Sequence, residues 1–321
     1  MVARICKIIL LVQFLAIMSI AAFLASALHW PWPSALLFGL GFALAVRFLI
    51  ASNNFRIAAR TRSRLPEQYR LGPLATARLL LGEYKATMFS SSWTMPFRRF
   101  GRRIPEQPHG LPVLLVHGYG CNSGYWHGMS RALTEARIAH QAIDMEPVIG
   151  SIDEYADLIY DAIEALCRDT GHSQVIVVGH SMGGLAARAY IRRHGPHRIA
   201  KAITLGTPHH GTALAHFGVG VNTQQMRWTA SATKASNDAT QQEGVASDWL
   251  LQLAAGESED VYRLFVSIYS HHDNIISPQI SSHLEGARNI EFHAIGHVAL
   301  ALHFRVQATV IDEILHASAA H

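Results

Sequence analysis

A serine set between two glycines carries the sharpest chemical signal in the sequence. The pattern G-x-S-x-G follows an apolar run at 175–178 and precedes a segment of helical composition at 182–194. A turn between strand and helix at this point is sharp and strained, so a side chain at either glycine would collide with neighbouring backbone. We expect such a turn, a nucleophile elbow, to raise the Ser181 hydroxyl to the carboxyl edge of a sheet as a nucleophile; an ordinary strand–helix turn is the alternative. The residues of the turn are Gly179, His180, Ser181, Met182 and Gly183.

A second glycine-containing turn, HGYG at 117–120, directly follows the apolar run at 113–116. Its glycines allow the loop to fold close to Ser181. The backbone N–H groups of Tyr119 and Met182 would then form an oxyanion hole for the charge that develops when the serine attacks a carbonyl. Losing one such donor costs about 10²–10³ in rate. We expect His117 to pack or to orient this loop rather than to act as a base.

The elements that must position these turns alternate between strand and helix from residue 111 onward. Apolar residues recur at helical spacing in 152–166, and the composition of 304–317 indicates a closing helix. Repeated alternation of this kind predicts a mostly parallel sheet flanked by helices on both faces. The expected strands are 113–116, 140–144, 175–178, 199–205, 264–269 and 290–295.

Taken in order, the segments HGYG, GHSMGG and LGTPHHGT (205–212) resemble the α/β-hydrolase superfamily, and within it the bacterial lipase and esterase branch with its triacylglycerol lipases. The resemblance covers roughly residues 111–318 and leaves out the N-terminal part. G-x-S-x-G is shared by the whole superfamily, whereas HGxG combined with LGTPHxG is more specific to lipase-like members. The resemblance implies an α/β-hydrolase fold and a catalytic triad in the chain order serine, acid, histidine.

The same resemblance assigns the other two catalytic residues. Asp273 follows a late strand candidate and begins a D-x-h-h-x-P pattern, where h is an apolar residue; His297 follows the last strand candidate in a Gly-His pair. Ser181, Asp273 and His297 would then act through an acyl-enzyme. Weaker candidates for the acid or the base are Asp248, Asp260, His293 and His303.

We expect no cofactor and no metal ion. The three cysteines form no C-x-x-C pair, H-E-x-x-H is absent, and no glycine-rich nucleotide loop follows a strand. His209 and His210 are conceivable as a metal pair, but ordinary loop histidines are the favoured interpretation. The paired aspartates that hold calcium in some bacterial lipases have no evident counterpart.

Charge is unevenly distributed along the 321 residues. Only 16% of the residues are charged, against roughly 25% in soluble domains, and this excludes a disordered chain or a coiled coil. Residues 47–110 hold twelve basic and three acidic residues, whereas residues 111–321 hold thirteen basic and twenty acidic ones. The catalytic part is therefore acidic, and nucleic acid is not an expected partner.

Two apolar runs near the N-terminus predict a transmembrane helical hairpin over residues 1–52. Residues 8–28 carry no charge and, at about 1.5 Å per residue, would span the roughly 30 Å of a hydrocarbon core. Residues 34–52 are interrupted only by Arg47, and the turn before them carries the tryptophans of a Trp-Pro-Trp-Pro sequence, which suit a membrane interface. A signal peptide and a buried or interfacial second helix are the alternatives.

Both ends of this hairpin are basic and its turn is not, so the positive-inside rule places both ends in the cytoplasm. We therefore expect an integral protein of a bacterial inner membrane with a cytoplasmic catalytic domain; that domain would be periplasmic if only 8–28 spans. Membrane lipids would contact residues 8–52, and the basic stretch 56–64 would face anionic headgroups at about 1 kcal/mol per charge. Residues 53–110 form a basic juxtamembrane connector, with helical periodicity at 66–89 and an extended, proline-containing approach at 91–112.

The expected function is that of a membrane-anchored serine hydrolase that cleaves carboxylic esters, with lipid-derived esters as the expected substrates. The catalytic domain would span 111–321 and include a possible lid at 213–258, for which a solvated surface loop is the alternative. The same triad would also serve a thioesterase or an acyltransferase. A non-catalytic, membrane-bound binding module is the alternative of another class, and the oligomeric state stays open.

Overall fold

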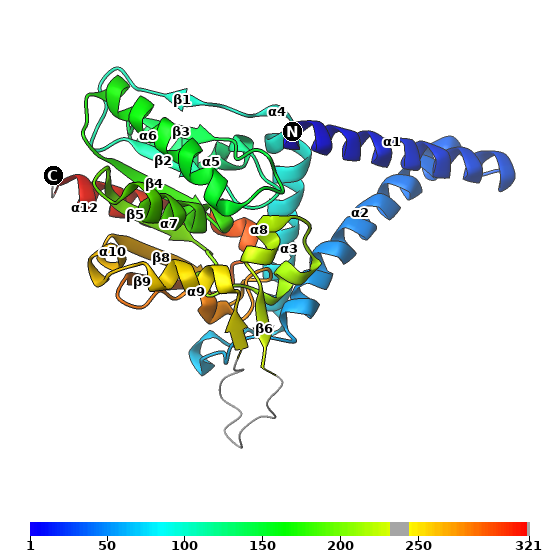
Figure 1. The fold of residues 1–321 in the computed structure, drawn as a ribbon. Coiled ribbons are helices and arrows are strands. Elements are labelled where there is room, and N and C mark those ends of the chain that lie inside the picture. The colour runs from blue at the N-terminus through cyan, green and yellow to red at the C-terminus, as the bar shows by residue number, and fades with distance from the viewer. Residues whose placement is uncertain (232–243, 320–321) are drawn as a thin grey trace.

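A computed structural model describes residues 1–231 and 244–319 of the chain. Figure 1 shows a body built on a central sheet, from one side of which two long helices project. The seven-stranded sheet has the order β1-β3-β2-β4-β5-β8-β9, and every neighbouring pair is parallel except β1 with β3. Its strands are β1 Arg102–Arg103, β2 Val113–Val116, β3 His140–Ile143, β4 Val175–His180, β5 Ile199–Leu205, β8 Phe265–Ser270 and β9 Arg288–Phe292.

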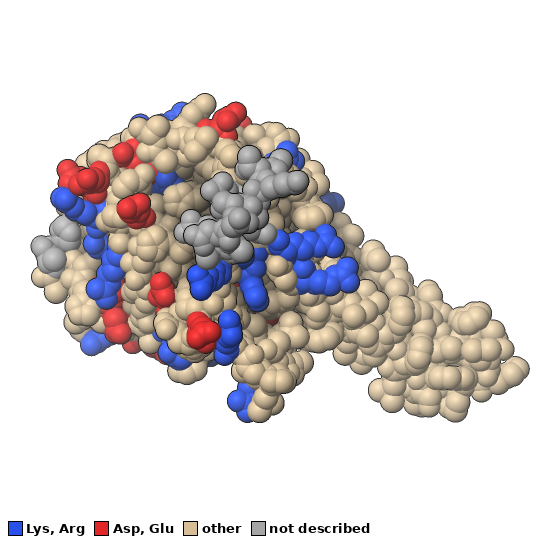
Figure 2. All heavy atoms as spheres, turned by 90° about the horizontal axis from the view of Figure 1, so that it is seen from below, with Lys and Arg blue, Asp and Glu red and all other residues tan. Residues whose placement is uncertain are grey.

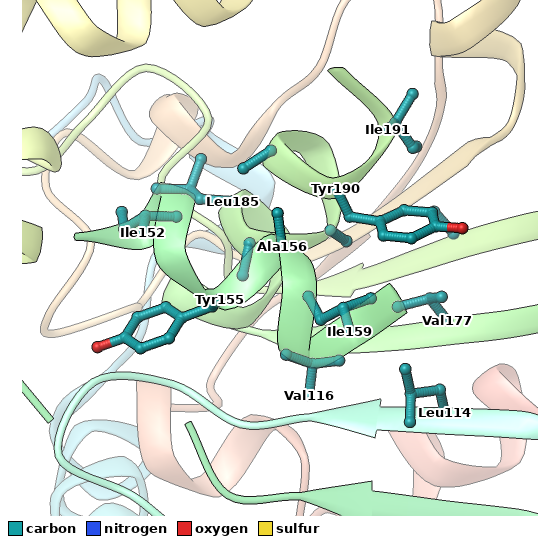
Figure 3. Close-up of a cluster of buried hydrophobic side chains, with 14 of the residues drawn as sticks. Leu114, Val116, Ile152, Tyr155, Ala156, Ile159, Val177, Leu185, Tyr190 and Ile191 are labelled. Atoms are coloured by element: carbon teal, nitrogen blue, oxygen red, sulfur yellow. The ribbon is translucent and has the colours of Figure 1, made fainter. Parts of the chain in front are cut away.

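Helices cover both faces of this sheet, as the alternating pattern predicts. In β2, Leu114 and Val116 belong to one buried cluster, which Figure 3 shows, while Val113 and Leu115 belong to the other. Successive side chains of a strand point to opposite faces, so a strand that is apolar throughout is buried on both. The main covering helices are α5 His127–Glu135, α6 Tyr155–Thr170, α7 Met182–His194 and α12 Phe304–Ala319.

The expected lid region contains several short elements beside the sheet. A 3₁₀ turn spans Ala213–Phe217, and β6 (Trp228–Ala230) pairs with β7 (Gly244–Ala246) as an antiparallel ribbon. Residues 232–243 of the expected lid lie outside the described residues. Two short helices also lie in the expected lid region, α8 Val221–Gln225 and α9 Asp248–Ala255. Two more follow it, α10 Glu259–Arg263 and α11 His297–Leu300.

The N-terminal region begins with α1 (Val2–Ala27) and α2 (Trp32–Ala58), which pack against each other as a hairpin. Close packing occurs at Gly39, where a Cβ would lie 2.9 Å from the carbonyl oxygen of Ile17. Both helices are long and apolar enough to cross a membrane, a test that a signal sequence or the core helix of a soluble protein also passes.

The two ends of the hairpin join the body. Val2 and Cys6 of α1 are buried in the same apolar cluster as Val113 and Leu115. Helix α2 does not stop near residue 52 but continues to Ala58, six residues into the expected connector. The boundary predicted at residue 52 therefore falls inside a helix.

Residues 59–110 depart further from the sequence-based expectation. Helix α3 runs over Pro73–Phe89 and therefore starts later than residue 66. The extended chain predicted from residue 91 is wrong at its start, because Ser90–Thr94 forms a π-helical turn and Met95–Phe97 a short helix, α4. Pro96 is compatible with this because it directly follows the π-helical turn, where the regular i→i−4 bonding of the helix is already interrupted.

Candidate active site

The turn around Ser181 has the strained geometry that its sequence predicts. Ser181 has φ 55° and ψ −125°, in a region that L-residues rarely adopt, and its N–H donates to the carbonyl of Leu205 at 2.9 Å. A Cβ at Gly183 would lie 2.2 Å from the carbonyl oxygen of Val116, and one at Gly179 would lie 2.7 Å from backbone nitrogen. Only glycine fits at either position, so both glycines serve to bring β4 and α7 into this tight turn.

The HGYG loop lies against the serine. A Cβ on Gly118 would be 2.9 Å from the Cβ of Ser181. Among the described residues, neither the Tyr119 N–H nor the Met182 N–H has a backbone acceptor, so both donors remain available at this position. The ring of His117 is buried and accepts the N–H of Met145 at 3.0 Å, and burial lowers its pKa. These contacts assign His117 to positioning the loop, as expected.

Asp273 and His297 form a buried pair. Oδ2 of Asp273 lies 2.7 Å from Nδ1 of His297, while Oδ1 accepts the N–H groups of Ile275 and Ile276 at 2.8 and 2.7 Å. The carboxylate therefore holds the Nδ1–H tautomer and leaves Nε2 free to accept a proton. Burial alone lowers the pKa of His297, but the attraction of Asp273 and its hydrogen bond, with a contribution from Glu83, raise that pKa overall.

The end of β5 brings this pair to the serine. Leu205 accepts the Ser181 N–H, and a Cβ on the next residue, Gly206, would lie 3.1 Å from Oδ2 of Asp273 and 3.3 Å from Nδ1 of His297. Within the described chain, no hydrogen bond joins the Ser181 hydroxyl to His297. Such bonds are often long in ligand-free enzymes and tighten when a substrate is bound.

The weaker candidates have other contacts. Asp260 pairs with Arg263 at the surface, and His293 stacks on Tyr69. His209 is buried beside Arg188, and the described residues contain no group of three His, Cys, Asp or Glu side chains that would hold a metal ion.

Glu83 of α3 is a site residue that the sequence analysis missed. Its side chain is 1% exposed, and its two carboxylate oxygens accept the N–H groups of Val298 and Ala299, both at 2.9 Å. These donors belong to the first turn of α11, which begins at His297. Burial raises the pKa of Glu83, and the two N–H bonds partly offset this. The sequence signal for its burial was that Glu83 lies on the same helical face as Leu79 and Ala86, because a single acid is unusual on an otherwise apolar face.

The end of α2 is tied to the loop that carries Asp273. The Ser277 hydroxyl donates to the carbonyl of Ala58 at 2.8 Å and lies 2.9 Å from the Thr61 hydroxyl. Farther along, the Ser63 N–H donates to the Gln279 side chain at 3.1 Å, and that side chain donates to the carbonyl of Asp273 at 2.9 Å. The loop that carries Asp273 is therefore fastened to the N-terminal region.

An apolar pocket of about 240 Å³ opens at Ser181. Its walls come from the HGYG loop, the lid region and the loop after Asp273, and α2 contributes Asn54 and Ile57. The Tyr119 hydroxyl, at the rim, donates to the carbonyl of Val219 at 2.9 Å and so holds the lid region beside the pocket. The pocket is suited to the hydrocarbon part of an acyl group whose carbonyl carbon lies at the serine.

Comparison with known proteins agrees with this geometry. Residues 112–278, just over half of the chain, match the alpha/beta hydrolase fold family, and the chain belongs to that family. This confirms the fold class and the family resemblance. Lipase BlEst2 of Bacillus licheniformis, in its propeptide form, superimposes with a TM-score of 0.52 at 18% identity over 66% of this chain and 53% of that one.

Curated relatives match a shorter part of the chain. A triacylglycerol lipase of Pseudomonas fragi is 34% identical over 112 residues, which are 32% of this chain and 36% of the lipase. A non-heme chloroperoxidase of Kitasatospora aureofaciens is 31% identical over 102 residues, 30% of this chain and 36% of that protein. The chain thus spans about a third of the length of these relatives.

Proposed function

We propose that the chain is a membrane-anchored serine hydrolase that cleaves carboxylic esters of apolar, lipid-derived acids. One observation carries the proposal. The pocket that opens at Ser181 is apolar, and part of its wall is Ile57 of α2, the second helix of the apolar hairpin. The 34% identity to a triacylglycerol lipase over 112 residues supports the same chemistry.

The proposed reaction assigns one role to each side chain. Nε2 of His297 takes the proton of the Ser181 hydroxyl as that oxygen attacks the ester carbonyl, and Asp273 stabilises the imidazolium. The N–H groups of Tyr119 and Met182 bind the oxyanion. The C–O bond then breaks, His297 protonates the leaving alcohol, and a water molecule activated by the same histidine releases the acid from Ser181.

The N-terminal hairpin supplies the anchor. Helices α1 and α2 expose most of their large apolar side chains, while Val2 and Cys6 at the start of α1 are buried in the body, which supports a retained anchor over a cleaved signal peptide. Lys7 and Arg56 lie near the ends that join the body. We therefore place the body on the cytoplasmic side of a bacterial inner membrane.

This arrangement gives the ester a direct path. An acyl chain in the bilayer beside α2 would meet the Ser181 pocket at Asn54 and Ile57, without passing through water. Holding the site at the membrane surface also raises the effective concentration of a lipid substrate.

The test is hydrolysis of p-nitrophenyl esters from acetate to palmitate by the full chain in detergent micelles, beside Ser181→Ala. We expect a chain-length optimum for the wild type and a loss of at least about 10⁴ in kcat for the variant. Ser130→Ala, a buried serine bonded to His140, is the matched control and should retain activity.

A fluorophosphonate probe separates the remaining outcomes. If the probe labels Ser181 but no ester is turned over, acyl transfer to an acceptor other than water would replace hydrolysis as the proposed reaction. A folded wild type that neither turns over esters nor reacts with the probe would refute the proposal.

A further inference from the structure

A second and larger pocket, of about 1160 Å³, lies against a different side of the last turns of α2. Phe55 and Ala58 of α2 and the adjoining Ala59 line it, whereas Asn54 and Ile57 line the pocket of Ser181. Its other walls are the segment 62–71, one side of α3 and the end of β8. The mechanism proposed above does not use this pocket.

The larger pocket is rich in positive charge. Arg62, Arg64 and Arg70 line it, and in the described part of the chain the one carboxylate that pairs with any of them is that of Glu67, 3.6 Å from Arg70. Asp273 also lines the pocket, and its carboxylate is hydrogen-bonded to His297 and to the backbone N–H groups of Ile275 and Ile276 rather than to an arginine.

Two histidines complete the list of titratable groups that face the pocket. His271 is hydrogen-bonded to Glu291 at 2.9 Å, and burial lowers the pKa of His272 to about 4, so that His272 is neutral at physiological pH. The balance therefore leaves Arg62 and Arg64 as two guanidinium groups without a carboxylate.

The arginine-bearing segment is held in place at both ends. Ser63 donates its N–H to Gln279, and its hydroxyl accepts the N–H of Ile280 at 2.9 Å. Tyr69 stacks on His271 and His293, with ring centroids 4.5 and 5.2 Å apart. Because these contacts order the backbone on both sides of Arg64, the pocket is preformed and its occupant need not order the segment on binding.

Figure 2 shows where this charge lies on the molecule. Basic side chains gather on the face where the hairpin joins the body, whereas the projecting hairpin itself shows almost none. The arginines of the pocket follow closely on the end of an apolar helix, at the level where lipid phosphates begin if that helix spans a bilayer.

We propose that this pocket binds the phosphate group of an anionic phospholipid of the adjoining leaflet, as a site separate from the Ser181 pocket. Arg62 and Arg64 would donate to the phosphate oxygens, the planar guanidinium being well matched to two oxygens of one phosphate. The apolar side chains of Phe55, Leu71 and Leu79 in the pocket wall suit the first carbons of the lipid. The proposal rests on the proposed membrane anchoring but not on ester hydrolysis.

The test uses the full chain in detergent with Ser181→Ala as background, so that lipid bound at the active site is not turned over. Native mass spectrometry would follow the binding of phosphatidylglycerol, with an excess of an uncharged monoacylglycerol to occupy the Ser181 pocket. The double variant Arg62→Gln/Arg64→Gln should weaken binding at least tenfold. The double variant Arg78→Gln/Lys85→Gln removes the same charge from exposed positions of α3 outside the pocket, and it should change binding less than twofold.

Two results would overturn the proposal. Equal losses in both double variants would mean that lipid binds through diffuse surface charge. Displacement of the lipid by inorganic phosphate or glycerol 3-phosphate at matched concentrations would assign the pocket to a soluble phosphate compound instead. Because turnover is absent from this assay, failure of the ester-hydrolase proposal would leave its outcome unchanged.

Discussion

The body from residue 111 onward, which holds every strand of the seven-stranded sheet except β1, and the N-terminal region, residues 1–110, contribute to the candidate site in different ways. The body supplies the groups proposed to touch substrate, and each lies at the carboxyl end of a strand: Ser181 after β4, Asp273 after β8 and His297 after β9. The N-terminal region contributes from the sides of helices. Glu83 of α3 holds the turn that begins at His297, and Ile57 of α2 lines the pocket.

The difference teaches that the N-terminal region is more than a tether. If the N-terminal region were only a tether, altering it would leave the Asp273–His297 pair intact. Instead, Glu83 fastens the His297 side of the pair, and the hydrogen bonds of Ser277 with Ala58 and Thr61 fasten the Asp273 side. The predictions below separate direct chemical roles in the body from supporting roles in the N-terminal region.

The largest effect is expected within the body, for Asp273→Asn. The amide of the variant would either donate its NH2 group to Nδ1 of His297 or accept the Nδ1–H more weakly than the carboxylate does. The imidazole would then lose both its fixed orientation and the negative charge that stabilises its protonated form. We expect kcat to fall by about 10⁴ with little change in KM. The control is Asp260→Asn, which alters a surface aspartate paired with Arg263 and should leave kcat unchanged. A larger loss in the control would move the acid to Asp260.

The next effect crosses from one region to the other. Glu83→Gln removes a charge that raises the pKa of His297, and it replaces one of the two accepting oxygens by an NH2 group, which cannot accept a backbone N–H. One of the two charge-assisted bonds, each worth about 1.5–3 kcal/mol, is therefore lost and the other is weakened. We expect kcat/KM to fall by about ten- to a hundredfold. Because His297 acts as a base only when neutral, a lower pKa must shift the acid limb of the pH profile toward lower pH.

A purely structural role of Glu83 would reduce the rate without moving that limb. Glu67→Gln, at an exposed glutamate of the same N-terminal region, is the control and should alter neither quantity. An unchanged acid limb in Glu83→Gln would contradict the electrostatic part of the interpretation.

The same division explains what the sequence allowed us to predict. The strands carry local signals in their apolar runs, and the turn at Ser181 carries one because Gly179 and Gly183 are required by backbone atoms 2.7 and 2.2 Å from a Cβ. In the HGYG loop, Gly118 is required by the Cβ of Ser181 at 2.9 Å and Gly120 by its positive φ of 66°. Glu83 and Ser277 act through contacts across more than 200 residues, and nothing in their immediate neighbours reveals a partner. The continuation of α2 to Ala58 was missed because Asn53, Asn54 and Arg56 interrupt the apolar pattern that indicates the helix, although they do not interrupt the helix itself.

A smaller effect, on stability, tests the fastening of the acid loop. Ser277→Ala removes the bonds to Ala58 and Thr61 and leaves a buried carbonyl oxygen without this donor, so we expect the free energy of unfolding to drop by about 1–2 kcal/mol. Ser282→Ala is the matched control, because the Ser282 side chain is equally buried and its hydroxyl has no hydrogen-bond partner among the described residues. Chemical denaturation in detergent would measure both; equal losses would show that the bonds to the N-terminal region contribute nothing.

The smallest effect concerns the part of the pocket that α2 supplies. Ile57→Ala removes methyl and methylene groups from the wall and makes room for roughly one or two more carbons of an acyl chain, each worth about 0.8 kcal/mol when buried. The ratio of kcat/KM for palmitate over butyrate esters should therefore rise about fourfold, with the rate for butyrate little changed. Ile50→Ala provides the control, because Ile50 lies two turns earlier on the same face of α2, is 62% exposed and does not line the pocket. A ratio that rises equally in both variants would place the effect of α2 in its contacts with detergent or lipid. A rise confined to Ile57→Ala would make α2 one of the determinants of acyl chain length.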